Sequence, residues 1–433
     1  MTLSRAEDRV VDAIRVSQGE LVGLVRELVA LDTCYREPGG SAGQETALQR
    51  LLQRRLEAIG ADTDLWEPDP TGRGNLHVPD DLSFEGRPQL VGHLSGSGRG
   101  SSLLLLGHID CVPVGPLDAW TTPPFSAAVR DGRIYGRGAA DMKGGIASLV
   151  VALETLVKQG LRPGGDVVFC SVTDEESSGA GSLAAVKHGV RADAGLCAEN
   201  TGFDLWTACR GSVVCDVDIV GRAGHAECRQ PHWTEGGAVN AIDKAALLLA
   251  ALRSLGEEWR DRPDHRHRLL PPGNAVPVAI SGGDWEATIP STCRITANVQ
   301  FLPGHVDGAG HIGGVREEVE GALRAASAAD PWLVAHPPRC RWHPHVLPAE
   351  ISESDPLVSS IVACSAKVGR ESRVVGLDSW HDPANFIRLA GVPTVSFGPG
   401  ELSSSHVVDE WLDIEALVDH CSAVALTVLE YCA

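Results

Sequence analysis

Residues 102–110 read SLLLLGHID, a short apolar run that ends in a histidine and an aspartate. Three more runs have the same form, namely DVVFCSV at 166–172, DAGLCAE at 193–199 and VPTVSFG at 392–398. Each is almost continuously apolar and bounded by glycine, proline or charge, which is typical of strands buried on both faces of a parallel sheet. Stretches with helical periodicity alternate with these runs, so the sequence predicts an α/β protein with one mostly parallel central sheet.

The segment from about 211 to 346 has a different order of elements. It predicts in turn a strand (CDVDIVG), a helix (AVNAIDKAALLLAALRSLGEEW), two strands (VPVAISGG and CRITANVQFL), a helix (VREEVEGALRAAS) and a strand (CRWHPHVLP). This βαββαβ order is that of a ferredoxin-like unit. We therefore predict one domain in two parts, residues 1–210 and 347–433, which is interrupted by an inserted second domain at residues 211–346.

Composition narrows the choice of partners. The chain of 433 residues has a formal net charge of −20, so nucleic acid and anionic membrane surfaces would repel it. No apolar run approaches the roughly 20 residues needed to cross a bilayer. The N-terminal stretch carries charges at helical spacing in place of the apolar core of a signal peptide. We expect a cytoplasmic protein that acts on a small molecule and binds neither nucleic acid nor membrane.

Polar side chains follow the apolar runs at their carboxyl ends, where open α/β sheets bind ligands. Seven of them stand out: His108 and Asp110 after the first run, Glu175 and Glu176 after the second, Glu199 at the end of the third, His406 after the fourth, and Asp141 in the glycine-rich turn YGRGAADMKGG. The chain has no P-loop motif and no G-x-S-x-G nucleophile elbow. This inventory favours metal-assisted chemistry over kinase or serine-hydrolase chemistry.

Imidazole and carboxylate groups are ordinary zinc ligands, and a pair of ions roughly 3.5–4 Å apart needs a bridging carboxylate as well as terminal ligands. We predict two divalent ions, zinc first, with cobalt or manganese as alternatives. The predicted ligands are the bridging Asp141, His108 and Glu199 on one ion, and Glu176 and His406 on the other. Glu175 is then left to take a proton from water. Asp110 can accept the other ring N–H of His108 and so fix the tautomer of that imidazole.

Five motifs in order resemble those of the M20 family of metallopeptidases and deacylases, especially its acetylornithine deacetylase and succinyl-diaminopimelate desuccinylase branch. The motifs are GHIDCVP, GRGAADMKGG, DEES, AGHAE with AVNAI, and GVPTVSFGPG with SSSHVVDEW. The resemblance spans about residues 20–425. It implies the same ligand set, Glu175 as general acid and base, a supporting role for Asp110, and a cis peptide bond after Asp141.

The same resemblance implies that residues 1–210 and 347–433 form the catalytic domain and that the inserted domain at 211–346 is a lid or dimerisation domain, and it assigns roles to residues there. It implies that His225 stabilises the oxyanion, often across a homodimer formed through this domain, and that Asn240 lies near the substrate. Many relatives carry Asp-x-Arg where this chain has Asn298-Val299-Gln300, so an arginine that holds a substrate carboxylate is missing. Arg294 is the nearest substitute on that strand, but it lies six residues away, roughly 20 Å at the usual rise of a strand.

These observations predict a deacylase that hydrolyses the amide bond of a small N-acyl amino acid or related amide. A neutral short acyl group, acetyl or formyl, is the first choice because Gln300 offers hydrogen bonds without charge. Two alternatives stay open: a dipeptidase or aminopeptidase on the same scaffold, and a family member that binds metal without turnover. The role of His381, in DSWHDPANF, also stays open between a polar rim contact and an incidental one.

Overall fold

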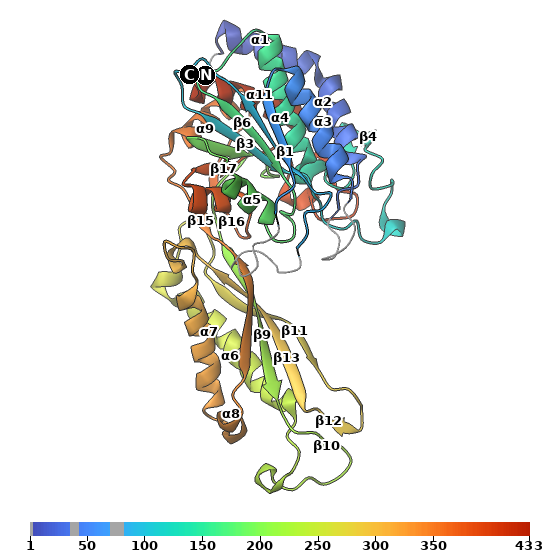
Figure 1. Ribbon diagram of the computed structural model, residues 1–433, viewed down its shortest axis with the longest axis vertical. Coiled ribbons are helices and arrows are strands. Elements are labelled where there is room, and N and C mark those ends of the chain that lie inside the picture. Colours follow the sequence, from blue (N-terminus) through green and yellow to red (C-terminus); the bar gives the residue numbers. More distant parts are fainter. Residues whose placement is uncertain (1–2, 35–42, 70–81) are drawn as a thin grey trace.

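The computed structural model describes residues 3–34, 43–69 and 82–433, and Figure 1 shows them in two lobes. The larger lobe is built on a sheet with the strand order β1-β2-β6-β3-β7-β17-β8-β15, in which β16 also pairs with β8. The strands are β1 (Asp62–Trp66), β2 (Gln89–Leu94), β3 (Leu103–His108), β6 (Val167–Val172), β7 (Ala194–Cys197), β8 (Leu205–Cys209), β15 (Ala349–Glu350), β16 (Val374–Leu377) and β17 (Thr394–Ser396).

The four strands predicted from the sequence are neighbours in this sheet. They are β6, β3, β7 and β17, each parallel to the next. Every residue in them is buried, as the continuous apolar runs require. The strands outside this group pair antiparallel with it, β2 with β6 and β8 with β17. The mostly parallel central sheet is thus confirmed, with antiparallel pairs added at its edges.

Helices cover the sheet, and their sequences explain where they begin. A capping box between Ser4 and Glu7 starts the first helix, and the Asp413 side chain caps the last. The helix α4 is mostly apolar and is buried along most of its length, because it packs against other helices as well as the sheet. The helices of this lobe are α1 (Arg5–Val16), α2 (Gln18–Val29), α3 (Glu45–Ala58), α4 (Gly144–Lys158), α5 (Ala180–His188), α9 (Pro356–Lys367), α10 (Pro383–Asn385) and α11 (Ile414–Tyr431).

The smaller lobe has the predicted ferredoxin-like order, with an antiparallel sheet arranged β11-β13-β9-β14. Buried and exposed residues alternate along β13, because one face of the sheet packs against two long helices and the other is open (Figure 1). Its elements are β9 (Gly211–Val220), α6 (Ala241–Asp261), β11 (Asn274–Gly282), β13 (Thr292–Phe301), α7 (Gly313–Ser327), α8 (Pro331–Ala335) and β14 (Arg339–Val346).

Each lobe has its own cluster of buried apolar side chains, one around β3 and α4 and the other around β9 and α6. A division of the chain at 211 and 346 fits the start of β9 and the end of β14, and it stays a proposal about domain boundaries. Short ribbons complete the fold: β4 (Ala128–Arg130), β5 (Arg133–Tyr135) and β18 (Trp411–Asp413) in the larger lobe, and β10 (Gly224–His225) with β12 (Thr288–Ile289) at the tip of the smaller one.

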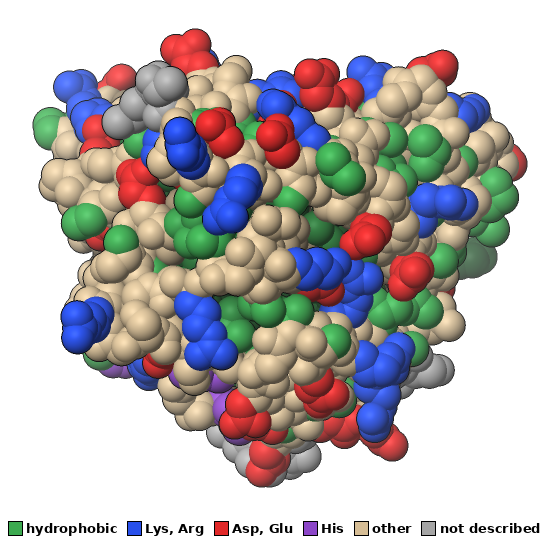
Figure 2. Space-filling view, turned by 90° about the horizontal axis from the view of Figure 1, so that it is seen from above, with side chains coloured by type: hydrophobic (Ala, Val, Ile, Leu, Met, Phe, Trp, Pro, Cys, Tyr) green, Lys and Arg blue, Asp and Glu red, His purple; other side chains and the backbone are tan. Residues whose placement is uncertain are grey.

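The surface at the end opposite the smaller lobe carries charges of both signs. Figure 2 shows basic and acidic side chains interspersed over this face, so the described residues form no continuous basic surface there. Within the described ranges, no helix combines the length and apolarity that crossing a membrane requires.

Candidate metal centre and active-site cleft

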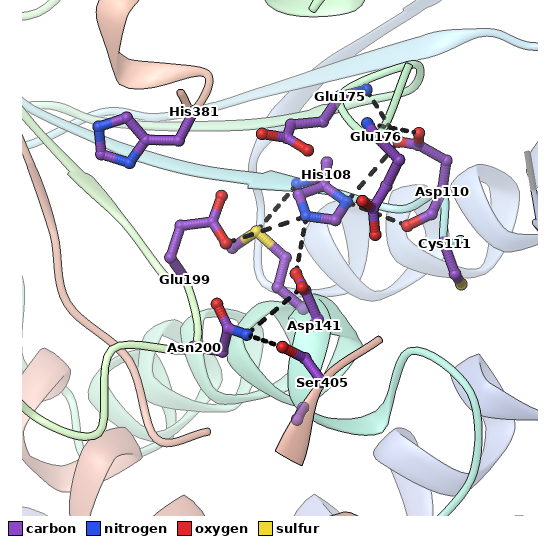
Figure 3. A network of polar contacts seen from close by, with 12 residues as sticks. His108, Asp110, Cys111, Asp141, Glu175, Glu176, Glu199, Asn200, His381 and Ser405 are labelled. Carbon is purple, nitrogen blue, oxygen red and sulfur yellow. Dashed lines mark hydrogen bonds and ion pairs between the residues drawn. The ribbon is translucent and has the colours of Figure 1, made fainter. Parts of the chain in front are cut away.

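The polar residues singled out in the sequence meet at the carboxyl edge of the parallel strands, and Figure 3 shows all of them except His406. His108 is the last residue of β3, and Glu199 lies two residues beyond β7. Glu176 follows β6, and Asp141 lies in the glycine-rich turn before α4. His406 comes from the segment between β17 and β18. Because the strands run in one direction, their carboxyl ends bring these side chains to one site.

Asp141 lies between the two histidines. Its Oδ1 atom is 3.1 Å from His108 Nε2, and its Oδ2 atom is 3.2 Å from His406 Nε2. Glu199 lies 3.9 Å from His108 Nε2, and Glu176 lies 3.1 Å from His406 Nε2. The ligand atoms therefore form two groups that share Asp141, each group lying within 4.8 Å. This is the same partition that the sequence predicted for the two ions.

The donor set suits divalent cations. The Oε1 atom of Glu176 is buried without a hydrogen-bond partner among the described residues, which is unusual for a polar atom in a folded protein. Burial raises the pKa of Glu176 to about 7 and that of Glu199 to about 8, and the charge of Asp141 adds to both increases. A cation among these carboxylates would offset their mutual repulsion and use the orphaned oxygen. The residues present thus fit a metal centre.

Asp110 supports the site in a different way from that predicted. The Nδ1 atom of His108 lies 3.0 Å from the backbone oxygen of Asp110 and 3.7 Å from its carboxylate. The ring N–H therefore donates to the backbone, which leaves Nε2 facing Asp141. The carboxylate of Asp110 instead accepts the backbone N–H groups of Glu175 and Glu176, each at 3.2 Å. The residue expected to orient a histidine thus also positions two glutamates.

A buried ion pair that the sequence analysis missed holds the turn around Asp141. Arg137 Nη1 lies 2.7 Å from Glu410 Oε2, and both side chains are almost fully buried. The other oxygen of Glu410 accepts the backbone N–H groups of Ala140, at 2.9 Å, and of Asp141, at 3.2 Å. The peptide bond between Asp141 and Met142 is cis, as the family resemblance implies. Glu410 thus ties the segment after β17 to the turn that presents Asp141.

Asn200 is a second supporting residue that the sequence analysis missed. Its Nδ2 atom lies 3.3 Å from Asp141 Oδ2 and 2.6 Å from Ser405 Oγ (Figure 3). Asn200 directly follows Glu199, and Ser405 directly precedes His406. The amide therefore joins the carboxylate at the centre to the segment that carries the second histidine. In the sequence, the only signal for Asn200 was its position directly after Glu199, a predicted ligand.

A cleft of about 400 Å³ opens over the centre. It is lined by residues of both lobes, with Ser212 and Val346 coming from the smaller one: Asp141, Glu175, Glu176, Ser177, Glu199, Asn200, Trp206, Ser212, Val346, Leu377, Ser379, Trp380, His381, Leu402 and His406. No lysine or arginine occurs among these described lining residues. The cleft therefore offers carboxylates, imidazoles and apolar surface, but no permanent positive charge.

Glu175 faces the same space as Glu199 and His381 in Figure 3. Burial raises the pKa of Glu175 well above its usual value, although the nearby His108 opposes that shift. A carboxylate in this environment binds a proton more readily than one in water. Its position and affinity for protons suit the general base predicted for this residue.

Three predicted residues of the inserted domain do not join this cluster within one chain. His225 lies on β10, exposed at the tip of the smaller lobe (Figure 1). Asn240 caps α6 by accepting the N–H of Ile242, at the same tip. Arg294 is exposed and pairs with Asp218 at 2.6 Å. None of the three lines the cleft.

Gln300 lies much closer to the cleft than Arg294. In the antiparallel pairing of β13 with β9, Gln300 stands opposite Ser212, and Ser212 stands opposite Val346 on β14. Directly opposed residues in such a sheet project from the same face. Since Ser212 and Val346 both line the cleft, we infer from the register that Gln300 lies in the row of residues beside that lining, at the rim of the cleft, although it is not itself one of the lining residues.

Comparison with known proteins agrees with this geometry. Residues 104–430 match the model for peptidase family M20/M25/M40. The chain belongs to this family. An N-formyl-4-amino-5-aminomethyl-2-methylpyrimidine deformylase of Halalkalibacterium halodurans is 29% identical over 95% of the chain and 94% of its own length. A succinyl-diaminopimelate desuccinylase of Cupriavidus necator is 29% identical over 84% of the chain and 89% of its own length.

The solved structures agree on the fold of this M20 chain. An M20 family metallo-carboxypeptidase from Sulfolobus solfataricus superposes with a TM-score of 0.73 and 16% identity, covering 95% of this chain and 99% of its own. Family membership and the deacylase relatives confirm that the protein is a metal-dependent amide hydrolase.

Proposed function

We propose that the chain is a two-metal deacylase that removes a short uncharged acyl group, formyl or acetyl, from a small amide. The observation that carries this proposal is the rim of the cleft, where Gln300 stands opposite Ser212 and no lysine or arginine lines the described walls. An acidic acyl group such as succinyl would lose a charge-assisted pairing worth about 1.5–3 kcal/mol at such a rim. The relative named as a deformylase supports the same choice.

The proposed ligands follow the two groups of side chains. Asp141 would bridge, His108 and Glu199 would hold one ion, and Glu176 and His406 the other. When bound, a pair of divalent ions, zinc first with cobalt or manganese as alternatives, would polarise the amide carbonyl and lower the pKa of water.

Glu175 carries the proton in this proposal. It accepts a proton from the attacking water and delivers it to the leaving nitrogen, for which a raised pKa is suited. The Asp110 carboxylate fixes the backbone on which Glu175 stands, so that the base is held in place before the substrate arrives.

A homodimer through the inserted domain would complete the site. His225 lies at the far tip of the smaller lobe, so an oxyanion contact from it would have to reach the cleft of a second copy. The edge strand β11 carries Val278 and Ile280, which are 59% and 50% exposed. Exposed apolar side chains on an unpaired strand edge favour association.

A panel of amides tests the proposal. The purified protein, supplied with zinc, cobalt or manganese, is assayed on N-formyl, N-acetyl, N-succinyl and N-glutaryl amines and amino acids, and on unblocked dipeptides. We expect kcat/KM for the formyl or acetyl compounds to exceed that for the acidic acyl compounds by about tenfold or more. A preference for succinyl or glutaryl compounds would contradict the choice of acyl group. A preference for dipeptides would replace it with the peptidase alternative.

A further inference from the structure

One wall of the cleft is aromatic and uncharged. Trp206, on β8, and Trp380, in the segment after β16, both line the cleft. They belong to one apolar cluster together with Leu377, which lines the cleft as well. The ring of His381 lies 5.9 Å from that of Trp206, measured between centroids. All three side chains line the same cleft as the proposed metal ligands, and we call them the aromatic wall: Trp206, Trp380 and His381.

His381 belongs to this wall as a neutral ring. It is only 4% exposed, and burial lowers its pKa to about 3. Its Nδ1 atom lies 3.0 Å from the hydroxyl of Ser396, which fixes the orientation of the ring. A histidine in this state carries no charge, so it can take part in the wall as an uncharged ring.

Contacts on both sides of Trp380 fix its position relative to Glu175, the proposed base. Arg210 donates its backbone N–H to the oxygen of Ser379 and its Nε to the oxygen of Asp378, at 3.1 and 2.7 Å. The ring of Trp380 packs so closely over Gly179 that a Cβ atom there would lie 1.9 Å from Cη2. Gly179 belongs to the same loop as Glu175, so the ring and the base keep a fixed relative position.

The side chains that line the cleft favour one class of group over another. Among the described lining residues no lysine or arginine could pair with a substrate carboxylate. Aromatic side chains, in contrast, bind flat rings by stacked or edge-on contacts.

We propose that the aromatic wall binds a planar, uncharged aromatic ring on the amine side of the amide, so that the substrate is a short N-acyl derivative of an arylmethylamine. This inference rests on the proposed deacylase function, because a formyl or acetyl group leaves the ring no place on the acyl side. Hydrolysis breaks the C–N bond: the oxygen of water joins the acyl carbon, and a proton passes to the nitrogen. The products are a short carboxylate and an arylmethylamine.

A matched pair of substrates tests the wall. N-benzylformamide and N-(cyclohexylmethyl)formamide have nearly the same size and the same amide, but only the first has a flat aromatic ring. We expect the protein to hydrolyse the benzyl compound with a kcat/KM roughly 3 to 10 times higher, mainly through a lower KM. Trp380→Leu should abolish that ratio, and Trp380→Phe should keep most of it. Trp285→Leu is the control, since Trp285 is 67% exposed on the smaller lobe and outside the cleft.

The outcomes separate the two proposals. If neither formamide nor the matching acetamides are hydrolysed, the proposed function fails. The wall is then tested by calorimetric titration of the metal-loaded protein with benzylamine and with cyclohexylmethylamine. We expect benzylamine to bind roughly 3 to 10 times more tightly. Equal kcat/KM values, equal binding of the two amines, or a ratio unchanged by Trp380→Leu would overturn the inference about the wall. The titration needs no variant, so it decides the matter even if Trp380→Leu fails to fold.

Discussion

His108 donates its ring N–H to the backbone oxygen of Asp110 at 3.0 Å, while the carboxylate of Asp110 lies farther away, at 3.7 Å. The carboxylate is occupied by the backbone N–H groups of the two glutamates that follow β6. One residue thus serves two parts of the site with two different groups. A substitution at position 110 changes the carboxylate and leaves the backbone oxygen in place.

Asp110→Asn is expected to reduce turnover more than metal binding. The amide retains one accepting oxygen, so one of the two backbone hydrogen bonds from Glu175 and Glu176 is lost, while the backbone contact to His108 survives. We expect kcat to fall about 10- to 100-fold, in the range found for residues that orient the groups around a metal. Elemental analysis should show nearly normal metal content. Loss of metal together with activity would show that the carboxylate orients His108 directly.

Glu175→Gln is expected to abolish turnover while metal content stays near normal, because the amide keeps the shape but cannot accept a proton. The loss in kcat should be about 10²- to 10⁴-fold, the usual contribution of a general base. Glu176→Gln is the matched comparison on the neighbouring residue. It should lower metal affinity first, because Glu176 contacts His406 within one of the ligand groups. If Glu175→Gln instead loses metal and Glu176→Gln loses only turnover, then Glu175 is the ligand and Glu176 the base.

Elemental analysis should find two divalent ions per chain. Two groups of ligand atoms share Asp141, and a single ion would leave one histidine and one glutamate of the described cluster unused. Chelation should remove activity, and zinc, cobalt or manganese should restore it. A reproducible ratio of one ion per chain with excess metal present would contradict a bridging role for Asp141.

The metal-free protein is expected to lose stability as the pH rises. Burial raises the pKa of Glu176 to about 7 and that of Glu199 to about 8, from 4.5 for an unperturbed glutamate. A carboxyl group with a raised pKa binds more protons in the folded than in the unfolded chain, so stability falls between the two pKa values. The Tm of chelator-treated protein should therefore fall from about pH 5 to about pH 8, with a much smaller change in metal-loaded protein. A parallel decline in both forms would show that the cause lies outside the metal centre.

The sequence was most informative where chemistry follows directly from local pattern. The apolar runs of β3, β6, β7 and β17 predicted both the parallel sheet and the edge at which the ligand residues meet. Arg137 and Glu410 had no such signal, because 273 residues separate them and only the fold makes them a buried pair. The tryptophans of the cleft were likewise missed, since a lone tryptophan in a sequence indicates a core residue as readily as a ligand contact.

In the inserted domain, motif resemblance suggested roles that the structure of a single chain does not explain. Motif resemblance suggested roles for His225 and Asn240 near the substrate, but both lie at the tip of the smaller lobe within one chain. Motifs report what a family has in common, whereas the distance between a tip and a cleft depends on how lobes and subunits assemble. The register of β13 was needed to see that position 300, and not position 294, belongs to the rim.

Gln300→Arg is expected to change which acyl groups the protein accepts. Position 300 stands opposite Ser212 in the row at the rim of the cleft, on the face from which Ser212 reaches the lining. A guanidinium there would supply the bidentate, charge-assisted partner that a carboxylate otherwise lacks, worth about 1.5–3 kcal/mol. We expect kcat/KM for N-succinyl compounds to rise about 10- to 100-fold relative to N-formyl compounds. Ser281→Arg is the control, because Ser281 lies on β11 opposite Arg294, outside the cleft. If both variants raise kcat/KM for N-succinyl compounds equally, the cause is long-range attraction, which salt screens. Such a result would contradict the placement of position 300 at the rim of the cleft.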